Sequence, residues 1–348
     1  MKRAPLKNEF RWSVSRQACF DECQKKYWYT YYGSWDGWPV NAFDPNRKVD
    51  PLAALLYRLK QIQSLPLFIG SVVHETIEEA LKKHHKQLPS AEVLRLDARK
   101  RFLKGIEESK EKKWLDHPKK FSNLFEWYYN TNLPTEEAIA TYIERIEQMI
   151  ASWRNSPAIN QVIIDAKARW SGIEQNIEFL VDSVPVIVVI DFMLFWPNSE
   201  GDILIIFDWK TGGERKENIE QLYAYAMAAQ IKLHQPIDKV VITPFYLAQG
   251  VTGYKKIGFK QTETLDLKIV EEVQNKIRKE GSKLLAIHKE SSQDPLLFPY
   301  TENREKCLSC PFVEVCKKAN YEPLTREELT SLILVNKETR KEKAESLL

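Results

Sequence analysis

The spacing of apolar and polar residues divides the chain near residue 160. Before this point apolar residues recur every three to four positions, which predicts amphipathic helices. The clearest example is "TEEAIATYIERIEQMIASW", where Thr135 is placed to cap a helix whose apolar face runs from Ile139 to Trp153. We predict further helices over residues 13–32, 52–62, 70–86 and 91–113.

After residue 161 the apolar runs become short, β-branched and aromatic, with turn residues between them, which predicts strands. We place the strands at residues 177–183, 186–196, 202–210, 239–248 and 253–259, and helices at 218–234 and 266–289. The predicted fold is α/β, with a mostly helical N-terminal region (1–160), a mixed core (161–290), and a Cys-rich segment and tail (291–348). Residues 291–306 read as loop.

Composition adds limits to this picture. The chain has 348 residues, of which 43% are hydrophobic and 28% charged, enough for one large domain or two closely joined ones. The first residues lack a signal peptide, and the most apolar stretch, residues 184–196, is too short to span a bilayer. We therefore expect a soluble, cytoplasmic protein with no membrane partner. The net charge of +3 permits nucleic-acid binding without requiring it.

Charged residues end the apolar run "IIFDWKTGG", where Asp208 and Lys210 follow a predicted buried strand. A hairpin centred between Ser199 and Glu200 would set Asp191 opposite Asp208, with their Cβ atoms about 5 Å apart. Two such carboxylates require either a proton or a cation between them, and Mg²⁺ suits oxygen ligands. Lys210 lies on the same face and could assist phosphodiester hydrolysis. The alternative is a buried ion pair between Asp208 and Lys210, which is commoner for an isolated tripeptide.

The ordered set of Asp191, then Asp208-Trp209-Lys210, then "QLYAYA" resembles the PD-(D/E)XK nuclease superfamily. Within it, the chain is most similar to the RecB-like exonuclease branch, which includes nuclease domains of AddB-type helicase–nucleases and CRISPR adaptation nucleases. An upstream "GSVVH" segment, from Gly70 to His74, fits that branch as well. One departure is that "VIVVID" has no glycine shortly before Asp191, as the branch often does.

The resemblance implies a restriction-endonuclease-like mixed sheet flanked by helices, and it implies roles for single residues. Mg²⁺ or Mn²⁺ would be bound by His74, Asp191 and Asp208. The catalytic set would be Asp191, Asp208, Lys210, Gln221 and Tyr225, in which the last two position the phosphate or the lysine. Gln221 and Tyr225 are four residues apart and so share one helix face. Taken alone, His74 is more often a packing or surface residue, and Tyr225 could simply pack.

Five cysteines in a chain of this length are free thiols or metal ligands rather than a disulfide framework. Cys307, Cys310 and Cys316 in "CLSCPFVEVC" suggest one metal site that lacks a local fourth ligand. The resemblance implies that an N-terminal cysteine completes a [4Fe–4S] cluster that staples the two chain ends together. Cys23 precedes basic and aromatic residues, as in that branch, and Cys19 is the reserve ligand or a free thiol. A Zn²⁺ site remains the alternative.

The expected substrate is DNA, single-stranded or at ends. Aromatic residues crowd the segment after Cys23, beside Lys25 and Lys26, and aromatic rings next to positive charge suit single strands, although some must belong to the core. No G-x-x-x-x-G-K-[ST] motif occurs, so any helicase would act in trans. The leading prediction is a metal-dependent DNA nuclease, with exonuclease action expected. The alternatives are a non-cleaving DNA-binding scaffold and a partner subunit of a helicase–nuclease complex. The pathway (repair, CRISPR adaptation or phage replication) stays open.

Overall fold

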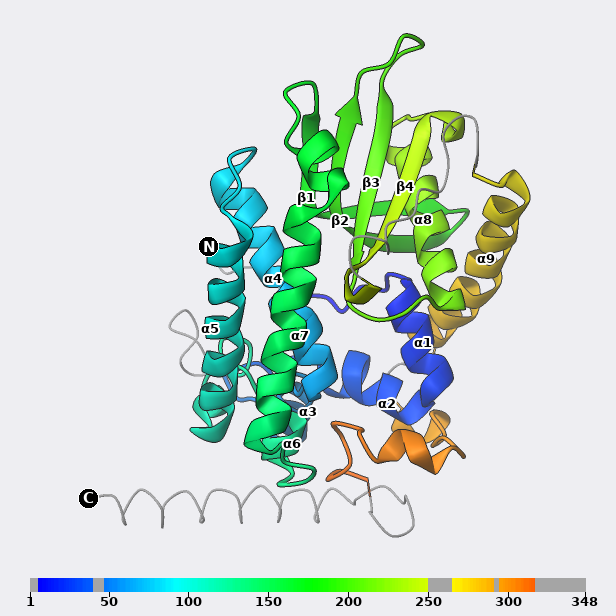
Figure 1. Cartoon of the computed structure of the whole chain (residues 1–348). Helices are drawn as coiled ribbons and strands as arrows, with labels where there is room; N and C mark the ends of the chain where they lie inside the picture. Colours follow the sequence, from blue (N-terminus) through cyan, green and yellow to red (C-terminus); the bar gives the residue numbers. More distant parts are fainter. Residues whose placement is uncertain (1–5, 40–46, 250–264, 291–293, 317–348) are drawn as a thin grey trace.

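The computed structural model describes residues 6–39, 47–249, 265–290 and 294–316 (Figure 1). Within these residues, a four-stranded sheet is flanked by helices on both faces, so the predicted α/β class with a mixed sheet is confirmed. The strand predicted at 253–259 lies outside the described residues.

Helices dominate the part of the chain before the sheet. They are α1 (Val14–Glu22), α2 (Gln24–Trp28), a π-helical turn (Tyr29–Gly33), α3 (Pro51–Leu59), α4 (Leu65–His84), α5 (Ala91–Lys110), α6 (Phe125–Tyr128) and α7 (Glu136–Asn155), with short turns at Lys113–Leu115 and Ala158–Ile163. Thr135 caps α7 as predicted, because its side-chain oxygen accepts a hydrogen bond from Ala138 N. Helix α4 begins before the predicted residue 70, since Pro66 is compatible with a first helical turn.

The single helix predicted over residues 13–32 is wrong. Cys23 has an extended backbone with φ −164° and ψ 115°, which ends α1. The Cys23 sulfur accepts a hydrogen bond from Lys26 N and so caps α2. An N-cap cysteine gave no recognisable start signal, because Ser, Thr, Asp and Asn are the usual caps. The break sets Cys23 at a helix end rather than in the middle of one.

The sheet has the order β1-β2-β3-β4. Its strands are β1 (Arg169–Val181), β2 (Val184–Trp196), β3 (Ile203–Lys210) and β4 (Val240–Tyr246). The β1–β2 and β2–β3 pairs are antiparallel, whereas β3–β4 is parallel and is connected through α8 (Lys216–Lys232). The register predicted for the hairpin is confirmed, since Phe192 faces Phe207 and Trp196 faces Ile203. Strand β1 begins earlier than predicted. Its first half is polar, so the sequence did not show the apolar pattern by which the other strands were predicted.

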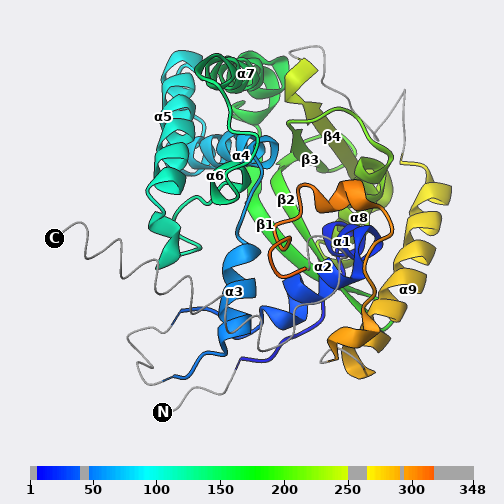
Figure 2. The same cartoon turned by 90° about the horizontal axis from the view of Figure 1, so that it is seen from below.

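Two apolar clusters cover the two faces of the sheet. Helices α4, α5 and α7 pack on one face, and α1, α8 and α9 (Leu267–Glu290) pack on the other (Figure 2). Along β2, alternate residues from Val184 to Ile190 contact the α8 side, but Phe192 and Leu194 contact the α4 side. Side chains normally alternate along a strand without interruption, so the change of face marks a local distortion at Asp191.

The C-terminal segment, residues 294–316, folds against the N-terminal helices (Figure 1). It contains two short 3-10 turns, at Pro295–Leu297 and Arg304–Cys307. Lys25 N donates to Pro299 O at 3.0 Å, and Tyr129 OH donates to Pro311 O at 2.8 Å. The two ends of the described chain therefore meet in the folded protein. Across the described residues, no helix is long and apolar enough to cross a membrane.

Candidate active site

The side chains of His74, Glu174 and Asp191 converge at the distortion in the sheet. His74 comes from α4, Glu174 from β1 and Asp191 from β2. His74 Nδ1 lies 3.8 Å from Asp191 Oδ1 and 3.9 Å from Glu174 Oε1. One ligand atom from each residue lies within 4.8 Å of the others. The second oxygen of Asp191 accepts a hydrogen bond from Trp209 N at 2.6 Å, which fixes the carboxylate against β3.

Glu174 is the member of this group that the sequence did not predict. Ile173 pairs with Phe192 and Gln175 with Ile190, so Glu174 lies opposite Asp191 in the sheet. Its φ is 48°, in the left-handed region, which costs a residue with a side chain about 1–3 kcal/mol. Strain of this kind persists where the surrounding structure holds it, and functional sites are a common location. The residues around Glu174 are mostly polar, so the sequence lacked the alternation of apolar and polar residues that would have predicted this part of β1 and its pairing with Asp191.

Gly70 allows α4 to approach the end of β3. A Cβ at residue 70 would lie 3.2 Å from Thr211 Oγ1, one residue after Lys210 and closer than ordinary contact. Residues 70 and 74 share a helix face, so the close approach at Gly70 brings His74 to the sheet one turn later. The spacing of the "GSVVH" segment therefore has a structural reason in this chain.

A closed ring of hydrogen bonds joins the end of β3 to α8. Lys210 Nζ lies 2.7 Å from Asp208 Oδ2 and donates to Gln221 Oε1 at 2.7 Å. Gln221 Nε2 donates to Tyr225 OH at 2.6 Å, and Tyr225 OH donates to Asp208 Oδ1 at 3.1 Å. Asp208 and Tyr225 are buried, and Lys210 is half-buried. Each donor and acceptor fixes the next, so the ammonium group of Lys210 is held in one position beside Asp208.

The pKa values show an excess of negative charge at the site. Burial raises the pKa of Asp191 well above its ordinary value, and the Asp208 carboxylate raises it further. Burial by itself would lower the pKa of His74, but the Glu174 and Asp191 carboxylates outweigh it and raise that pKa to about 9. Burial, followed by the charge of Asp208, also raises the pKa of Tyr225, which keeps its hydroxyl protonated as a donor. A bound cation would relieve this charge.

The donor set fits a divalent cation. Octahedral Mg²⁺ binds ligands at about 2.1 Å, so neighbouring ligand atoms stand about 3 Å apart, and the three side chains need to close by about 1–2 Å. Carboxylates suit Mg²⁺ and Mn²⁺, and an imidazole ligand favours the transition metal. Asp208 is not in the group of three; its oxygens contact Lys210 and Tyr225 instead. Its charge nevertheless acts on both His74 and Asp191.

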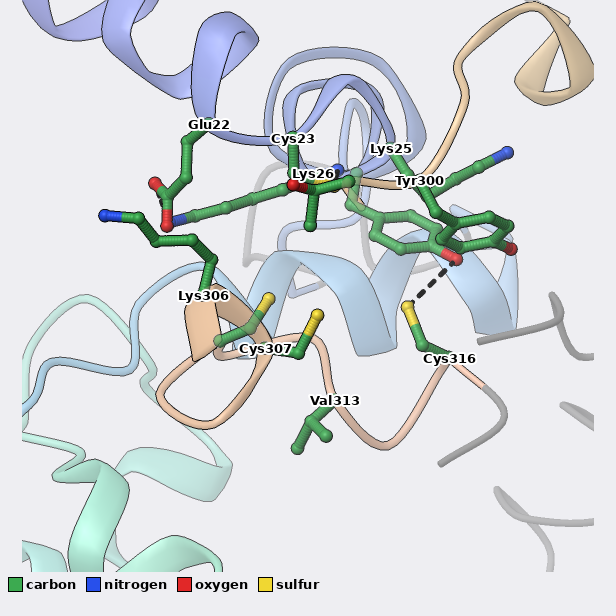
Figure 3. Close-up of a pocket in the computed structure, with 12 residues that line it drawn as sticks. Glu22, Cys23, Lys25, Lys26, Tyr300, Lys306, Cys307, Val313 and Cys316 are labelled. Atoms are coloured by element: carbon green, nitrogen blue, oxygen red, sulfur yellow. Dashed lines mark hydrogen bonds and ion pairs between the residues drawn. The ribbon is translucent and has the colours of Figure 1, made fainter. Parts of the chain in front are cut away.

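Four cysteines line a second candidate site, a cavity between α2 and the C-terminal segment (Figure 3). Cys307 and Cys316 point from that segment towards the helix turn that carries Cys23. The lining also contains Cys310 but not Cys19. Lys25 and Lys26 stand beside the thiols and would offset the charge of an anionic cluster.

The distances between the sulfur atoms can be compared with those that a zinc ion requires. A tetrahedral zinc ion with bonds of 2.3 Å requires sulfur atoms about 3.8 Å apart. Among the described residues, which include all five cysteines, no three sulfur atoms lie within 4.8 Å of one another. Burial raises the pKa of Cys310 to about 12 and that of Cys316 to about 11, so both are protonated thiols without a metal. The cavity that these thiols line measures about 30 Å³.

The aromatic residues after Cys23 belong mostly to the core. Tyr27, Trp28, Tyr29 and Tyr32 are at most 9% exposed, so the predicted stacking role is wrong for these four. Lysines at the C-terminal end of α4 are also paired: Lys82 and Lys83 form ion pairs with glutamates one turn earlier, and Lys86, just after the helix, donates to backbone carbonyls. DNA contacts must therefore be sought elsewhere.

A strand-end aspartate and lysine beside a carboxylate–imidazole group, on a mixed sheet, form an arrangement suited to metal-dependent phosphodiester hydrolysis. A family model of the PD-(D/E)XK nuclease superfamily matches residues 11–317, and the chain belongs to that superfamily. The superfamily assignment suggests a metal-dependent nuclease with DNA as substrate. No curated protein matches the chain significantly.

Proposed function

We propose that the protein is a Mg²⁺- or Mn²⁺-dependent deoxyribonuclease, of the RecB-like exonuclease branch, that acts on single-stranded DNA or DNA ends. The hydrogen-bonded ring of Lys210, Gln221, Tyr225 and Asp208 beside the His74–Glu174–Asp191 group is the observation that carries this proposal. A structural ion pair alone would not need the additional imidazole and two strand carboxylates next to it.

A divalent cation, when bound, supplies Lewis acidity to the phosphate and acidifies a water molecule. His74, Glu174 and Asp191 would hold it, with Asp208 at the edge of the group. The amine of Lys210 is held beside Asp208, where it would bind the attacking water or the charge that develops on the phosphate oxygens. Gln221 and Tyr225 contact Lys210 and Asp208, so their role is to position these two groups rather than to bind phosphate.

The test compares Lys210→Ala with the wild type on end-labelled single-stranded DNA in Mn²⁺. We expect loss of cleavage by about 10²- to 10³-fold, with DNA binding retained, because one electrostatic donor contributes about this much. Lys232→Ala, an exposed lysine at the end of α8, is the matched control. A denaturation curve shows whether the Lys210 variant is folded. Cleavage at the wild-type rate would refute the mechanism, and binding without cleavage by the wild type in any divalent ion would favour a DNA-binding scaffold.

We propose that Cys23, Cys307, Cys310 and Cys316 hold a structural [4Fe–4S] cluster. Their convergence on one cavity supports a shared group, and their spacing favours a group wider than zinc. Anaerobically purified protein should be brown and contain about four irons per chain. Colourless protein with one zinc would show the alternative to be right.

The motor for such a nuclease would come from another chain. With no nucleotide-motor motif in the sequence, we propose that the protein acts on free ends or single strands, or beside a helicase in trans. A polarity assay with each strand end blocked in turn, with and without a helicase, tests exonuclease action. Cleavage of a closed single-stranded circle would show endonuclease action instead.

A further inference from the structure

One face of the β1–β2 hairpin is covered by helices, and the opposite face is partly open to solvent. Alternate residues of β2 from Val184 to Ile190, and of β1 from Ile177 to Val181, are buried on the α8 side. The side chains between them point the other way. This second surface, the hairpin face, consists of Asn176, Glu178 and Leu180 from β1 and Pro185, Ile187 and Val189 from β2.

Apolar side chains occupy much of the hairpin face although solvent reaches it. Leu180 is 60% exposed and Val189 is 41% exposed. Pro185, directly opposite Leu180, and Ile187 are half-buried. When only one face of an antiparallel sheet packs on the core, the solvated face normally carries polar residues. Packing within the described part of the chain therefore does not explain these apolar residues.

The hairpin face begins at the metal-binding group. Asp191 follows Val189 by two residues on β2, and Glu174 precedes Asn176 by two residues on β1. Beyond this group the cross-strand pairs form three rows, which are Asn176–Val189, Glu178–Ile187 and Leu180–Pro185. A strand rises about 3.3 Å per residue, so the rows are about 6.6 Å apart and Leu180 lies about 20 Å from Glu174. A ligand at the metal-binding group could therefore continue along this face.

The charged residues of the hairpin face are paired with one another and with the N-terminal segment. Glu178 Oε1 lies 2.8 Å from Arg11 Nε, and an Arg11 terminal nitrogen lies 2.9 Å from Glu9 Oε2. The N-terminal segment is held there because Trp12 N donates to Pro185 O at 2.7 Å. Since two carboxylates share one guanidinium group, this part of the face has no excess positive charge. A DNA strand would contact it through bases rather than phosphates.

We infer that the hairpin face binds the bases of a single DNA strand whose backbone passes the metal-binding group. The inference rests on the proposed nuclease function and assigns single-stranded DNA as its substrate. The bases of a single strand have flat, largely apolar faces that pack on apolar side chains. In a duplex the same faces are stacked inside and cannot reach the sheet. At 3.4 Å per stacked nucleotide, the face would hold about six nucleotides.

The dimensions of the hairpin face favour a DNA strand over a protein partner. Neighbouring β-strands lie about 4.8 Å apart, so the face is about 10 Å wide and about 20 Å long, or roughly 200 Å². A stable protein interface buries about 800 Å² on each partner. A narrow face of this length, continuous with the metal-binding group, suits one extended chain of nucleotides.

The test is fluorescence anisotropy of a labelled ten-nucleotide oligo(dT) titrated with the full chain in EDTA, which removes divalent cations and so prevents cleavage. The variant Val189→Thr/Leu180→Gln approximately keeps the size of both side chains and replaces apolar atoms by polar ones. We expect it to weaken binding about fivefold or more, with Tm unchanged because both residues are exposed. Val93→Thr/Leu267→Gln, the same substitutions at exposed positions of α5 and α9, should bind as the wild type does.

A blunt DNA duplex distinguishes contact with bases from contact with phosphates, and the affinity for it should not change in the Val189→Thr/Leu180→Gln variant. Three results would overturn the inference: equal binding of oligo(dT) by the wild type and the variant, no binding by the wild type in EDTA, or an equal loss of affinity for duplex and single strand.

A protein interface on the hairpin face would give a different result. Sedimentation of a dimeric wild type and a monomeric variant would show that a second copy covers the face, and would overturn the inference as well. The binding assay contains no divalent cation, so its result does not depend on cleavage. If the cleavage test fails while the difference in oligo(dT) affinity remains, the protein is a scaffold that binds single strands on this face.

Discussion

The metal-binding group and the cysteine cavity differ in how far the folded chain has arranged the ligands. At the first, three ligands come from α4, β1 and β2, and Trp209 N and the ring around Lys210 hold the neighbouring groups in place. At the second, the thiols face a small cavity, burial raises the pKa of Cys310 and Cys316, and among the described residues no three sulfur atoms lie within 4.8 Å of one another. The first site gathers negative charge that a cation would relieve, whereas the proposed cluster at the second would join the two chain ends.

The largest effect is expected at the cysteine cavity. Cys310→Ser should remove iron and lower the free energy of unfolding by about 3–5 kcal/mol, because the cluster would close a loop that spans most of the chain. Urea denaturation of anaerobic protein, with iron analysis, measures both. Cys19→Ser is the control, since Cys19 does not line the cavity. A Cys310→Ser protein that keeps its iron and its unfolding midpoint would remove the cluster proposal.

At the metal-binding group, Glu174→Gln should weaken Mn²⁺ binding by at least about tenfold while the protein stays folded. The substitution keeps the shape of the side chain and removes one negative charge near His74 and Asp191. Calorimetric titration with Mn²⁺ measures the change. Glu178→Gln on the same strand, whose side chain pairs with Arg11 at the surface, is the control. Equal Mn²⁺ affinity in the two variants would show that Glu174 is not a ligand.

A smaller effect is expected within the ring. Tyr225→Phe removes one hydroxyl that bonds Gln221 and Asp208, which corresponds to about 1 kcal/mol, or a five- to tenfold loss of kcat with little change in KM. Steady-state cleavage rates in Mn²⁺ measure it. Tyr223→Phe, a buried tyrosine on the same helix, is the control. If KM rises while kcat is unchanged, Tyr225 binds phosphate instead of positioning Lys210.

The smallest effect concerns His288, which lies near the end of α9 and packs on Phe10 and Tyr32. Burial and then the charge of Arg16 lower the His288 pKa, and its Nδ1 lies 3.3 Å from Tyr32 OH. The unfolded chain therefore binds a proton more readily, so stability falls as pH drops below about 6.5 towards the folded pKa. His288→Gln should reduce the Tm difference between pH 7.5 and 5.5 by no more than about 2 °C. A larger acid sensitivity in the variant would contradict this.

The local pattern of apolar, polar and turn residues was sufficient to predict much of the secondary structure and the register of one hairpin. Apolar spacing marked the helices and strands, and turn residues between β2 and β3 set the register that Phe192 and Phe207 confirm. The motif order around Asp191, Asp208 and Lys210 indicated the superfamily that the family match then showed. These features depend on residues close together in the sequence, where periodicity of two or 3.6 carries the information.

Only the tertiary structure revealed that Glu174 lies beside His74 and Asp191, and that Asp208 contacts Lys210 and Tyr225 instead. Glu174 meets His74 because two strands distort together and Gly70 lets α4 come close, and neither is visible in the spacing of one segment. Likewise, the break at Cys23 and the burial of the aromatic residues after it depend on packing against residues 294–316. These contacts with α4 and with residues 294–316 join residues a hundred or more positions apart, and their free energy appears only when the chain has folded.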